Sequence, residues 1–413
     1  MHHLDPYQVD NLLLLIGGNP LPNYVAAQLL TKDRATTKII LVCSADTRDE
    51  AARRIERQLK VEGFGSITYC EVEEANPQDI RNQVMRAIQG LSGSIGLHYT
   101  GGTKAMSVHA YLALQTKADS RAQYSYLDAR RLELQIETGG RLGTIPDVGM
   151  LLPRPLRIET LLKLHKLEDL TDQSMQVTPL WPDAAQALAK LYTDADRAKG
   201  WRAWCDRTLR NEKDLLPTAS LSTMAIKDIP SAAVQAAFLA EYPDLTADDS
   251  LIRLAEKVGM PVNKRKVHLA KWFDGEWLEH HVLHTLIKPP SQFHELVMTI
   301  EPELGKNHTF EFDVAGIRGY QLFAFSVSTA SKKDRLKAKL LEAVVRAEQM
   351  GGSEARVALV CCADLEMVDT LKSEIATLFR QRQVTRVFGR DDLLDLHNKV
   401  ANWISNPGQG ERL

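Results

Sequence analysis

The sequence contains no apolar run that approaches the roughly 20 residues needed to cross a bilayer. An early apolar stretch, residues 12–16, is short and follows acidic residues, so we interpret it as a buried strand and not as a signal peptide. The five cysteines, at positions 43, 70, 205, 361 and 362, show no CxxC spacing. These absences argue against a membrane span, a disulfide framework and a cysteine-rich zinc site, and they favour a reduced, cytoplasmic protein.

An excess of one charge is also missing. The 51 Lys and Arg residues nearly balance the 53 Asp and Glu residues, which leaves a formal net charge of −2. Any contact with nucleic acid must therefore come from local basic patches. Of the 413 residues, 44% are hydrophobic and 25% are charged, as in soluble globular proteins. That length is too great for one ordinary core, so we expect two or three domains.

The most informative stretch is the glycine turn, residues 100–104, with the sequence Thr-Gly-Gly-Thr-Lys. It follows an apolar run at 94–97 and precedes residues 105–114, whose apolar positions recur at helical spacing. A strand therefore leads through this turn into a helix. The glycines let backbone N–H groups approach a ligand, the helix start attracts anions, and the threonines and lysine add donors. The turn favours phosphate binding, although a plain strand-to-helix turn with a solvated lysine stays open. It is not a P-loop, because the GxxxxGK[ST] spacing is missing.

Strands and helices alternate through the N-terminal part, which predicts an α/β fold with a parallel sheet and helices on both faces. We expect strands at 12–16, 37–43, 66–72 and 94–97, helices at 24–31, 48–62, 77–91 and 105–114, and a β-hairpin at 122–128 and 132–136 that Gly139-Gly140 ends. Ligands of such sheets bind beyond the carboxyl ends of the strands. The turns at 17–23, 44–47 and 100–104 follow those ends. We predict one shared ligand site there, against the plainer interpretation that loops of any α/β protein look alike.

The loop at 17–23, Gly-Gly-Asn-Pro-Leu-Pro-Asn, and the turn at 99–106, Tyr-Thr-Gly-Gly-Thr-Lys-Ala-Met, resemble the CRISPR-associated Rossmann fold (CARF) domain. The chain is similar to ancillary type III CRISPR nucleases, which join such a domain to a restriction-like nuclease domain. The resemblance implies a homodimer whose pocket, across the twofold axis, binds a cyclic oligoadenylate, with cyclic tetra-adenylate expected by analogy. Two copies of the glycine turn would meet a ring of repeated phosphates symmetrically.

The resemblance also implies the ligand-binding residues. They are Gly18, Asn19, Asn23, Ser44, Thr100, Gly101, Gly102, Thr103 and Lys104. The first three would face adenine or ribose, Ser44 would lie nearby, and the glycine turn would hold phosphate. Some domains of this family cleave their ligand slowly, and these residues leave that activity open.

The middle of the chain, residues 151–265, is predicted to be a helical connecting subdomain, in arrangement similar to a winged helix. A linker rich in Pro and Gly is expected at 145–156, helical segments at 158–165, 184–204 and 231–258, and a loop at 217–230. We interpret Lys264-Arg-Lys266 as a solvated loop and not as a nucleic-acid clamp, and Trp201 and Trp204 as core.

The last part, residues 266–413, resembles the PD-(D/E)xK nuclease fold. We expect a helix at 268–287, strands at 296–300, 309–314, 321–327, 355–360 and 385–388, and helices at 334–350 and 369–382, with the segment 391–398 after the last strand. That chemistry needs carboxylates to hold Mg²⁺ or Mn²⁺ and a lysine to orient water. The resemblance makes Asp313 the expected metal ligand, Glu279 the acid on the preceding helix, and Glu311 a flanking acid.

The second strand of this fold should carry a Glu-x-Lys pair, and this sequence lacks it. Ser326 stands in the place of the glutamate and Ser328 in the place of the lysine. A hydroxyl group supplies neither the carboxylate charge nor the ammonium, so we expect a loss of several orders of magnitude in rate. Lys332 and Lys333 follow closely and are the candidates to substitute from the helix side.

We therefore divide the chain into a ligand-sensing CARF domain at 1–150, a helical linker subdomain at 151–265 and a nuclease-like domain at 266–413. The first hypothesis is a dimeric cyclic oligoadenylate sensor in type III CRISPR antiviral defence, whose impaired nuclease-like domain engages nucleic acid or a partner. The alternative is a ligand-activated, metal-dependent DNA or RNA endonuclease with a relocated active site, in which Asp313 and Glu279 would hold the metal. A weaker third hypothesis is a nucleotide-binding regulator that acts on a promoter.

Overall fold

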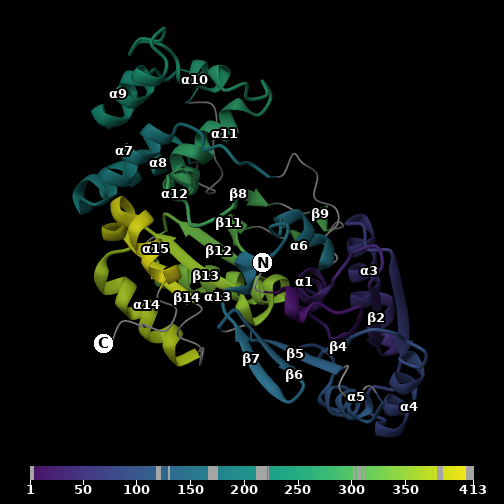
Figure 1. Ribbon diagram of the computed structural model, residues 1–413. Coiled ribbons are helices and arrows are strands. Elements are labelled where there is room, and N and C mark those ends of the chain that lie inside the picture. The colour runs from purple at the N-terminus through teal and green to yellow at the C-terminus, as the bar shows by residue number, and fades with distance from the viewer. Residues whose placement is uncertain are drawn as a thin grey trace.

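The structure is a computed structural model of the 413-residue chain. It describes residues 4–117, 122–128, 131–165, 175–210, 221, 223–300, 303–304, 308–309, 312–330, 332–378 and 385–405. Two large sheets, called here the N-terminal sheet and the C-terminal sheet, organise these residues (Figure 1). No helix in these ranges combines the length and the hydropathy that a membrane span requires.

The N-terminal sheet has seven strands in the order β3-β2-β1-β4-β5-β6-β7. The strands are β1 (Asn11–Leu15), β2 (Lys38–Cys43), β3 (Ser66–Glu71), β4 (Ile95–His98), β5 (Ala122–Asp128), β6 (Glu133–Thr138) and β7 (Arg141–Ile145). Strands β1 to β5 are parallel, which confirms the predicted parallel sheet, and β6 and β7 continue it antiparallel. The direction of strand succession reverses between β1 and β4, which makes this boundary a topological switch point.

Helices cover both faces of this sheet, and β1, which has four leucines after Asn11, is therefore buried along its whole length. The helices are α1 (Leu21–Leu30), α2 (Ala45–Thr47), α3 (Arg53–Val61), α4 (Pro77–Ala87) and α5 (Lys104–Lys117), with a π-helical turn at Arg48–Ala52. Alternate leucines of β1 belong to two different clusters. One cluster includes α1 and α3, and the other includes α4 and α5.

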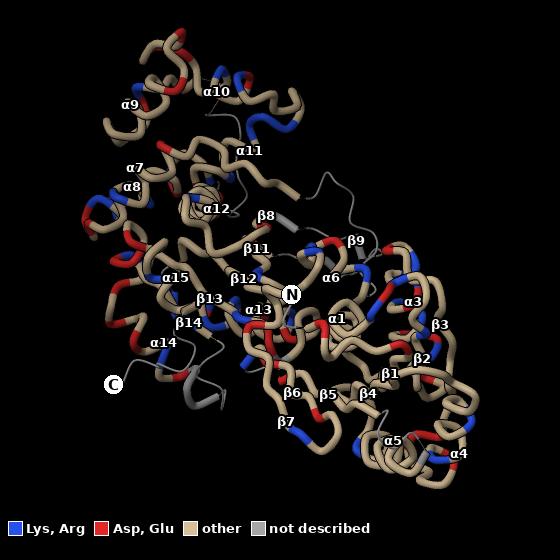
Figure 2. The backbone as a smooth tube through the Cα atoms, viewed as in Figure 1, with Lys and Arg blue, Asp and Glu red and all other residues tan. Residues whose placement is uncertain are grey.

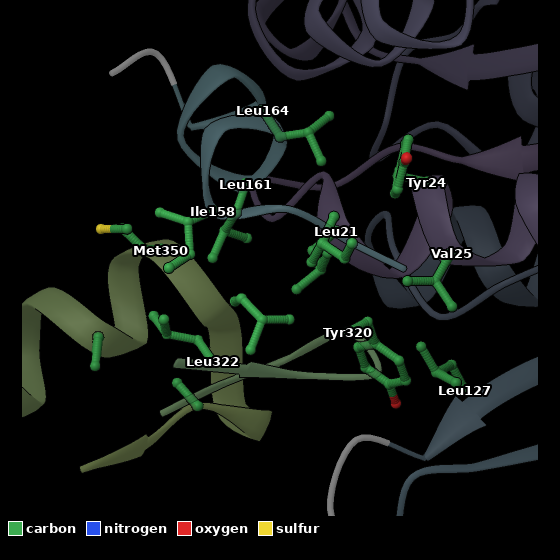
Figure 3. Packing of buried hydrophobic residues seen from close by; sticks show 14 of the residues in the cluster. Leu21, Tyr24, Val25, Leu127, Ile158, Leu161, Leu164, Tyr320, Leu322 and Met350 are labelled. Carbon is green, nitrogen blue, oxygen red and sulfur yellow. The ribbon is translucent and has the colours of Figure 1, made fainter. Parts of the chain in front are cut away.

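Helix α1 is buried on every side. It contains no charged residue, as Figure 2 shows, and a helix without a charged face is typical of a core. Leu21 and Val25 of α1 share one apolar cluster with Tyr320, Leu322 and Met350 from the other half of the chain (Figure 3). The two sheets are therefore joined by a continuous core with α1 between them.

A helical region lies between the two sheets in sequence. Its helices are α6 (Ile158–Leu164), α7 (Pro182–Tyr192), α8 (Ala195–Thr208), α9 (Ala232–Glu241), α10 (Leu251–Lys257) and α11 (Arg265–Lys271). Trp201 and Trp204 are buried here, which confirms that they belong to the core. The segment predicted to be helical at 184–204 is divided between two helices, because Asp194 accepts the N–H groups of the next turn and starts α8 as a separate helix.

The C-terminal sheet is mixed and has the order β14-β13-β12-β11-β8. Its strands are β8 (Glu295–Ile300), β11 (Phe312–Arg318), β12 (Gln321–Ser328), β13 (Arg356–Cys361) and β14 (Thr385–Phe388), and β9 (Glu303–Leu304) pairs separately with β10 (His308–Thr309). The helices are α12 (Trp277–Ile287), α13 (Lys333–Gly351), α14 (Leu365–Leu378) and α15 (Leu396–Ser405). Helix α13 lies on one face of β12, and α12 and α15 lie on the other. The α/β class predicted for both halves is confirmed.

Several expected boundaries differ from the structure. Gly139 and Gly140, with φ of 55° and 74°, turn the chain into β7 and do not end the sheet. Helix α1 begins at Leu21, before the predicted start at residue 24. Arg265 and Lys266 open α11 instead of lying in a loop. Glu311 lies outside the described residues, as do 379–382, the end of a predicted helix, and residues 217–220 and 222 of the loop predicted at 217–230.

Candidate functional site

The candidate ligand edge lies at the carboxyl ends of β1, β2 and β4, which are neighbours in the N-terminal sheet. The first loop, residues 17–20, follows β1, Ser44 follows β2, and the glycine turn follows β4 and leads into α5. The structure thus brings the three predicted turns to one edge. The first loop and the glycine turn meet at the switch point, where open α/β sheets bind their ligands.

The backbones of the first loop and the glycine turn touch each other. A Cβ atom added at Gly101 would lie 2.3 Å from the carbonyl oxygen of Leu15 and 3.1 Å from the nitrogen of Gly17. Gly102 has a φ of 75°, a conformation that favours glycine. A Cβ atom at Gly18, in contrast, would meet no heavy atom within 4 Å. The edge therefore presents closely packed backbone beside open space.

The hydroxyl groups of the two threonines are used differently. The Oγ1 of Thr100 accepts the N–H of Leu127 at 2.7 Å, so its proton remains available to a ligand. The Oγ1 of Thr103 accepts the N–H of Met106 at 3.2 Å and donates to the carbonyl of Glu74 at 2.9 Å. Thr103 therefore caps α5 and ties it to the segment after β3.

Charge divides this edge into two sides. Lys104 is exposed at the start of α5 and makes no ion pair within the described ranges. On the other side, Ser44 caps α2 and lines a groove of about 1110 Å³. The acidic residues that line this groove are Asp46, Glu71, Glu73, Glu74 and Asp79, together with the basic Arg86. An anion is therefore attracted to the α5 side and repelled from the groove.

The two asparagines predicted to face the ligand, Asn19 in the first loop and Asn23 in α1, have scaffold contacts. Asn23 is fully buried, and its amide nitrogen donates to the carbonyl of Leu15 at 2.9 Å. A ligand contact would require this side chain to leave that position. The Oδ1 of Asn19 accepts the N–H of Leu21 at 3.0 Å, and a Cβ atom at Gly352 would lie 2.2 Å from its Nδ2. Asn19 therefore touches both α1 and the turn that ends α13.

A buried histidine lies beneath the edge. His98 is the last residue of β4, and its Nδ1 lies 3.1 Å from the Oγ of Ser125. Burial lowers the pKa of His98 to about 3, so the imidazole is neutral. The positive charge near the glycine turn is therefore left to Lys104.

The second predicted site lies on the face of the C-terminal sheet that α13 covers. Asp313 of β11 is 6% exposed. Its Oδ2 accepts the N–H of Val327 at 2.6 Å and the hydroxyl of Ser326 at 3.3 Å. The Nζ of Lys339, from α13, lies 2.8 Å from Oδ2 and 3.1 Å from Oδ1, and it also donates to the carbonyl of Val327. Donors of the same chain therefore surround this carboxylate.

Two other residues predicted for the nuclease chemistry lie elsewhere. Glu279 is half-buried on α12, a helix that packs on the face of the sheet opposite to α13. The Oγ of Ser328 accepts the N–H of Ala330 at 3.2 Å in the turn after β12. The structure therefore does not bring Glu279 into the cavity beside Asp313, and Ser328 serves the local turn.

The lysine that reaches Asp313 is Lys339, which the sequence reasoning missed. Lys333 pairs instead with Glu374 at 3.0 Å, and Lys332 precedes the first turn of α13. The helical spacing of residues could have indicated this lysine. Lys339 follows the buried Leu336 by three positions and directly precedes the buried Leu340, on the helix that connects β12 to β13. A charged residue beside that apolar stripe can reach the strand below.

The residues at Asp313 do not form a divalent-metal site in this arrangement. Mg²⁺ and similar ions prefer carboxylate and other oxygen ligands. The described residues contain no group of three His, Cys, Asp or Glu side chains placed to hold a metal ion. The cavity of about 130 Å³ beside Asp313 is also lined by Glu342 and Arg346, which pair with each other at 2.5 Å. No metal-dependent step follows from these residues as they stand.

No family model and no curated protein sequence matches this chain. Solved structures match it in fold. Protein VC1899 from Vibrio cholerae covers 97% of this chain and 99% of its own, with a TM-score of 0.68 and 14% identity. Can2 from Sulfobacillus thermosulfidooxidans, solved in complex with cyclic tetra-adenylate, covers 95% of this chain and 99% of its own, with a TM-score of 0.60 and 15% identity. The restriction endonuclease PspGI, in complex with substrate DNA, covers 56% of this chain with a TM-score of 0.24 and 12% identity, too distant a likeness to carry an argument.

The two full-length likenesses confirm the predicted fold. The chain has the fold of Can2 and VC1899, a mostly parallel N-terminal sheet followed by a mixed C-terminal sheet.

Proposed function

We propose that this protein is a cyclic oligoadenylate sensor of type III CRISPR antiviral defence, that it binds cyclic tetra-adenylate as a homodimer, and that its nuclease-like half is catalytically impaired. The observation that carries the proposal is the full-length fold shared with Can2, a protein solved with cyclic tetra-adenylate. An identity of 15% supports a shared fold only, so the evidence for the ligand must come from the residues of this chain.

Binding of a phosphate ring is supported by the donors at the switch point. Gly101 and Gly102 are half-buried after the end of β4, Thr100 keeps a hydroxyl proton, and Lys104 supplies an exposed charge. A charge-assisted hydrogen bond to phosphate contributes about 1.5–3 kcal/mol. The open space around Gly18 leaves room for a base or sugar beside these donors.

The homodimer is supported by symmetry and by charge. A ring of repeated phosphates matches a twofold pair of glycine turns, so each protomer would contact an equivalent part of the ligand. The neutral His98 and the acidic groove beside Ser44 add no positive charge to this edge. Two copies of Lys104, one from each protomer, would therefore face the phosphates.

The impaired nuclease half is supported by the residues around Asp313. Serine occupies both strand positions at which Glu and Lys are expected, and Lys339 already neutralises the remaining carboxylate. A domain of this fold without its acid and lysine retains a surface for nucleic acid or for a partner. We infer that this surface, and not cleavage, is what the ligand controls.

The test of the ligand is a titration of cyclic oligoadenylates of different ring sizes, read as the melting temperature, with linear tetra-adenylate as the control. We expect the largest rise for cyclic tetra-adenylate and a smaller rise for Lys104→Ala. A protein that ignores every ring and is saturated by a linear or unrelated metabolite would contradict the proposal.

The test of the impaired half is incubation with supercoiled plasmid and single-stranded RNA, in the presence of Mn²⁺ and cyclic tetra-adenylate. We expect neither substrate to be cut. Cleavage that disappears in Asp313→Ala would establish the alternative, a ligand-activated endonuclease with a relocated active site.

A further inference from the structure

The pocket at Asp313 contains its own cation. We propose that the ammonium group of Lys339 takes the place on Asp313 that a divalent metal ion would need, so that this pocket is charge-balanced without metal. This inference rests on the nuclease-like half of the proposed function, and it does not depend on ligand binding at the glycine turn.

The contacts of Lys339 are those of a bound cation. Its Nζ lies 2.8 Å and 3.1 Å from the two oxygens of Asp313, so it bridges the carboxylate. It also bonds to the carbonyl oxygen of Val327, on the neighbouring strand. Carboxylate and backbone carbonyl oxygens are the ligands that hard divalent cations select. The ammonium group therefore uses the oxygen atoms that a metal ion would have to use.

The position of Lys339 is fixed by packing. Leu336 and Leu340 of α13 are buried in the core against the C-terminal sheet, and Lys339 lies between them in sequence at the edge of that apolar face. The side chain of Lys339 is 38% exposed, whereas that of Asp313 is 8% exposed. Burying a carboxylate without a partner costs free energy, so the folded protein is expected to keep this ion pair.

The neighbouring charges do not offer an alternative ligand set. Glu342, which lines the same cavity, pairs with Arg346 at 2.5 Å. Lys337 pairs with Glu374 at 2.7 Å on another side of α13. Asp313 and Lys339 thus balance one another, and a divalent ion could bind only after the ammonium group leaves.

The experiment measures Mn²⁺ binding, both as loss of the electron paramagnetic resonance signal of free Mn²⁺ and as a rise in melting temperature. The proteins are the full-length wild type, Lys339→Gln and Lys339→Ala. We expect no binding to the wild type at this pocket. Both variants should gain Mn²⁺ and a melting temperature higher by roughly 3 °C when the metal exceeds Kd about a hundredfold. Adding Asp313→Asn to either variant should abolish the gain.

Lys337→Ala is the matched control, because it removes a lysine of similar exposure from the same helix without touching Asp313. It should bind no Mn²⁺. Lys339→Arg keeps a cation in the pocket and should also bind none.

Two results would overturn the inference. One is Mn²⁺ binding to the wild type that disappears in Asp313→Asn, because Lys339 would then act beside a metal and not in its place. The other is a folded Lys339→Gln or Lys339→Ala protein that binds no Mn²⁺. If the lysine variants fail to fold, the wild-type titration still decides the first point. The response of the same proteins to cyclic tetra-adenylate reports the glycine turn separately, so either proposal can fail while the other stands.

Discussion

The glycine edge and the Asp313 pocket use their polar groups in opposite ways. At the edge, Gly18 borders open space, Lys104 is exposed, and Thr100 keeps its proton. At the pocket, the carboxylate of Asp313 accepts hydrogen bonds from a backbone N–H and a hydroxyl group and forms an ion pair with the ammonium group of Lys339. Groups without an internal partner are ready for an outside ligand, whereas saturated groups stabilise the fold. The difference indicates that binding belongs to the first region and packing to the second.

The two regions are nevertheless connected through one helix. Asn19 of the first loop touches Gly352 at the end of α13, and Lys339 lies within the same helix. Helix α1, which starts directly after the first loop, is enclosed in the core shared with Tyr320 and Leu322. If the first loop moves, it therefore acts on the C-terminal half through residues that are packed together and not through a flexible linker.

The largest expected effect concerns the backbone of the edge. In Gly101→Ala, the new Cβ atom would lie 2.3 Å from the carbonyl oxygen of Leu15, a contact that only movement of backbone can relieve. We expect a loss of about 3 kcal/mol in the free energy of unfolding and no response to cyclic tetra-adenylate. Urea denaturation and thermal shift measure the two effects. Gly200→Ala, on α8 and away from the edge, is the control and should keep the ligand response without losing stability, since its Cβ atom meets no neighbour within 4 Å. Wild-type behaviour of Gly101→Ala would mean that the edge does not depend on close backbone contact.

The next effect tests whether Lys104 is available to an outside anion. Lys104→Ala should weaken cyclic tetra-adenylate binding by about tenfold to a hundredfold, the loss expected for one charge-assisted hydrogen bond to phosphate. Isothermal titration calorimetry measures the affinity, and its dependence on salt should also become weaker. Lys199→Ala removes another exposed lysine, on α8, and should leave binding unchanged. Equal affinities for all three proteins would remove the charge argument for the edge.

The glycine edge could be predicted from sequence because its signals are local. The apolar run before the turn, the paired glycines and the helical spacing after it lie within about 20 residues, and the chain alternates strand and helix throughout this half. Strand β7 was missed for a local reason too. Four of its five residues are not buried, so it lacks the apolar pattern of a strand. The two glycines before it also indicate the end of the hairpin and not the start of another strand.

The Asp313 pocket could be predicted only in part. The strand residues Asp313, Ser326 and Ser328 follow from the motif, and so does the absence of Glu-x-Lys. The contact with Lys339 spans 26 positions and depends on how α13 crosses the sheet, which no short pattern contains. In the same way, the helical spacing of 184–204 continues through Thr193 and Asp194, and only the cap at Asp194 reveals two helices.

Acid should lower the free energy of unfolding of both halves of the molecule. The two halves can then be compared by the pH at which each unfolds. Burial lowers the pKa of His98 to about 3 and that of His280, on α12, also to about 3, from an ordinary value of 6.5. Between these values the unfolded chain binds protons that the folded chain does not, so stability is complete above pH 6.5 and falls as the pH falls. Each histidine contributes up to about 1.4 kcal/mol per pH unit in this window.

Urea midpoints at a series of pH values, for wild type, His98→Gln and His280→Gln, measure this dependence. Each variant should show a shallower loss of stability in acid than the wild type. His98→Gln should protect the response to cyclic tetra-adenylate in acid, because His98 lies beneath the ligand edge, whereas His280→Gln should not. Unchanged acid sensitivity in both variants would show that other groups control it.

The smallest effect separates two hydroxyl groups within the edge. Thr103→Ala should cost about 1 kcal/mol of stability, because the hydroxyl caps α5, and Thr103→Ser should restore it. Its effect on cyclic tetra-adenylate affinity should be slight, since the proton already goes to the carbonyl of Glu74. Thr100→Ala should instead lower that affinity by about tenfold, because Thr100 accepts from Leu127 and keeps its proton for the ligand. If calorimetry finds the greater loss at Thr103, the ligand must draw that hydroxyl away from Glu74, and the division between scaffold and binding groups at this edge would have to be reversed.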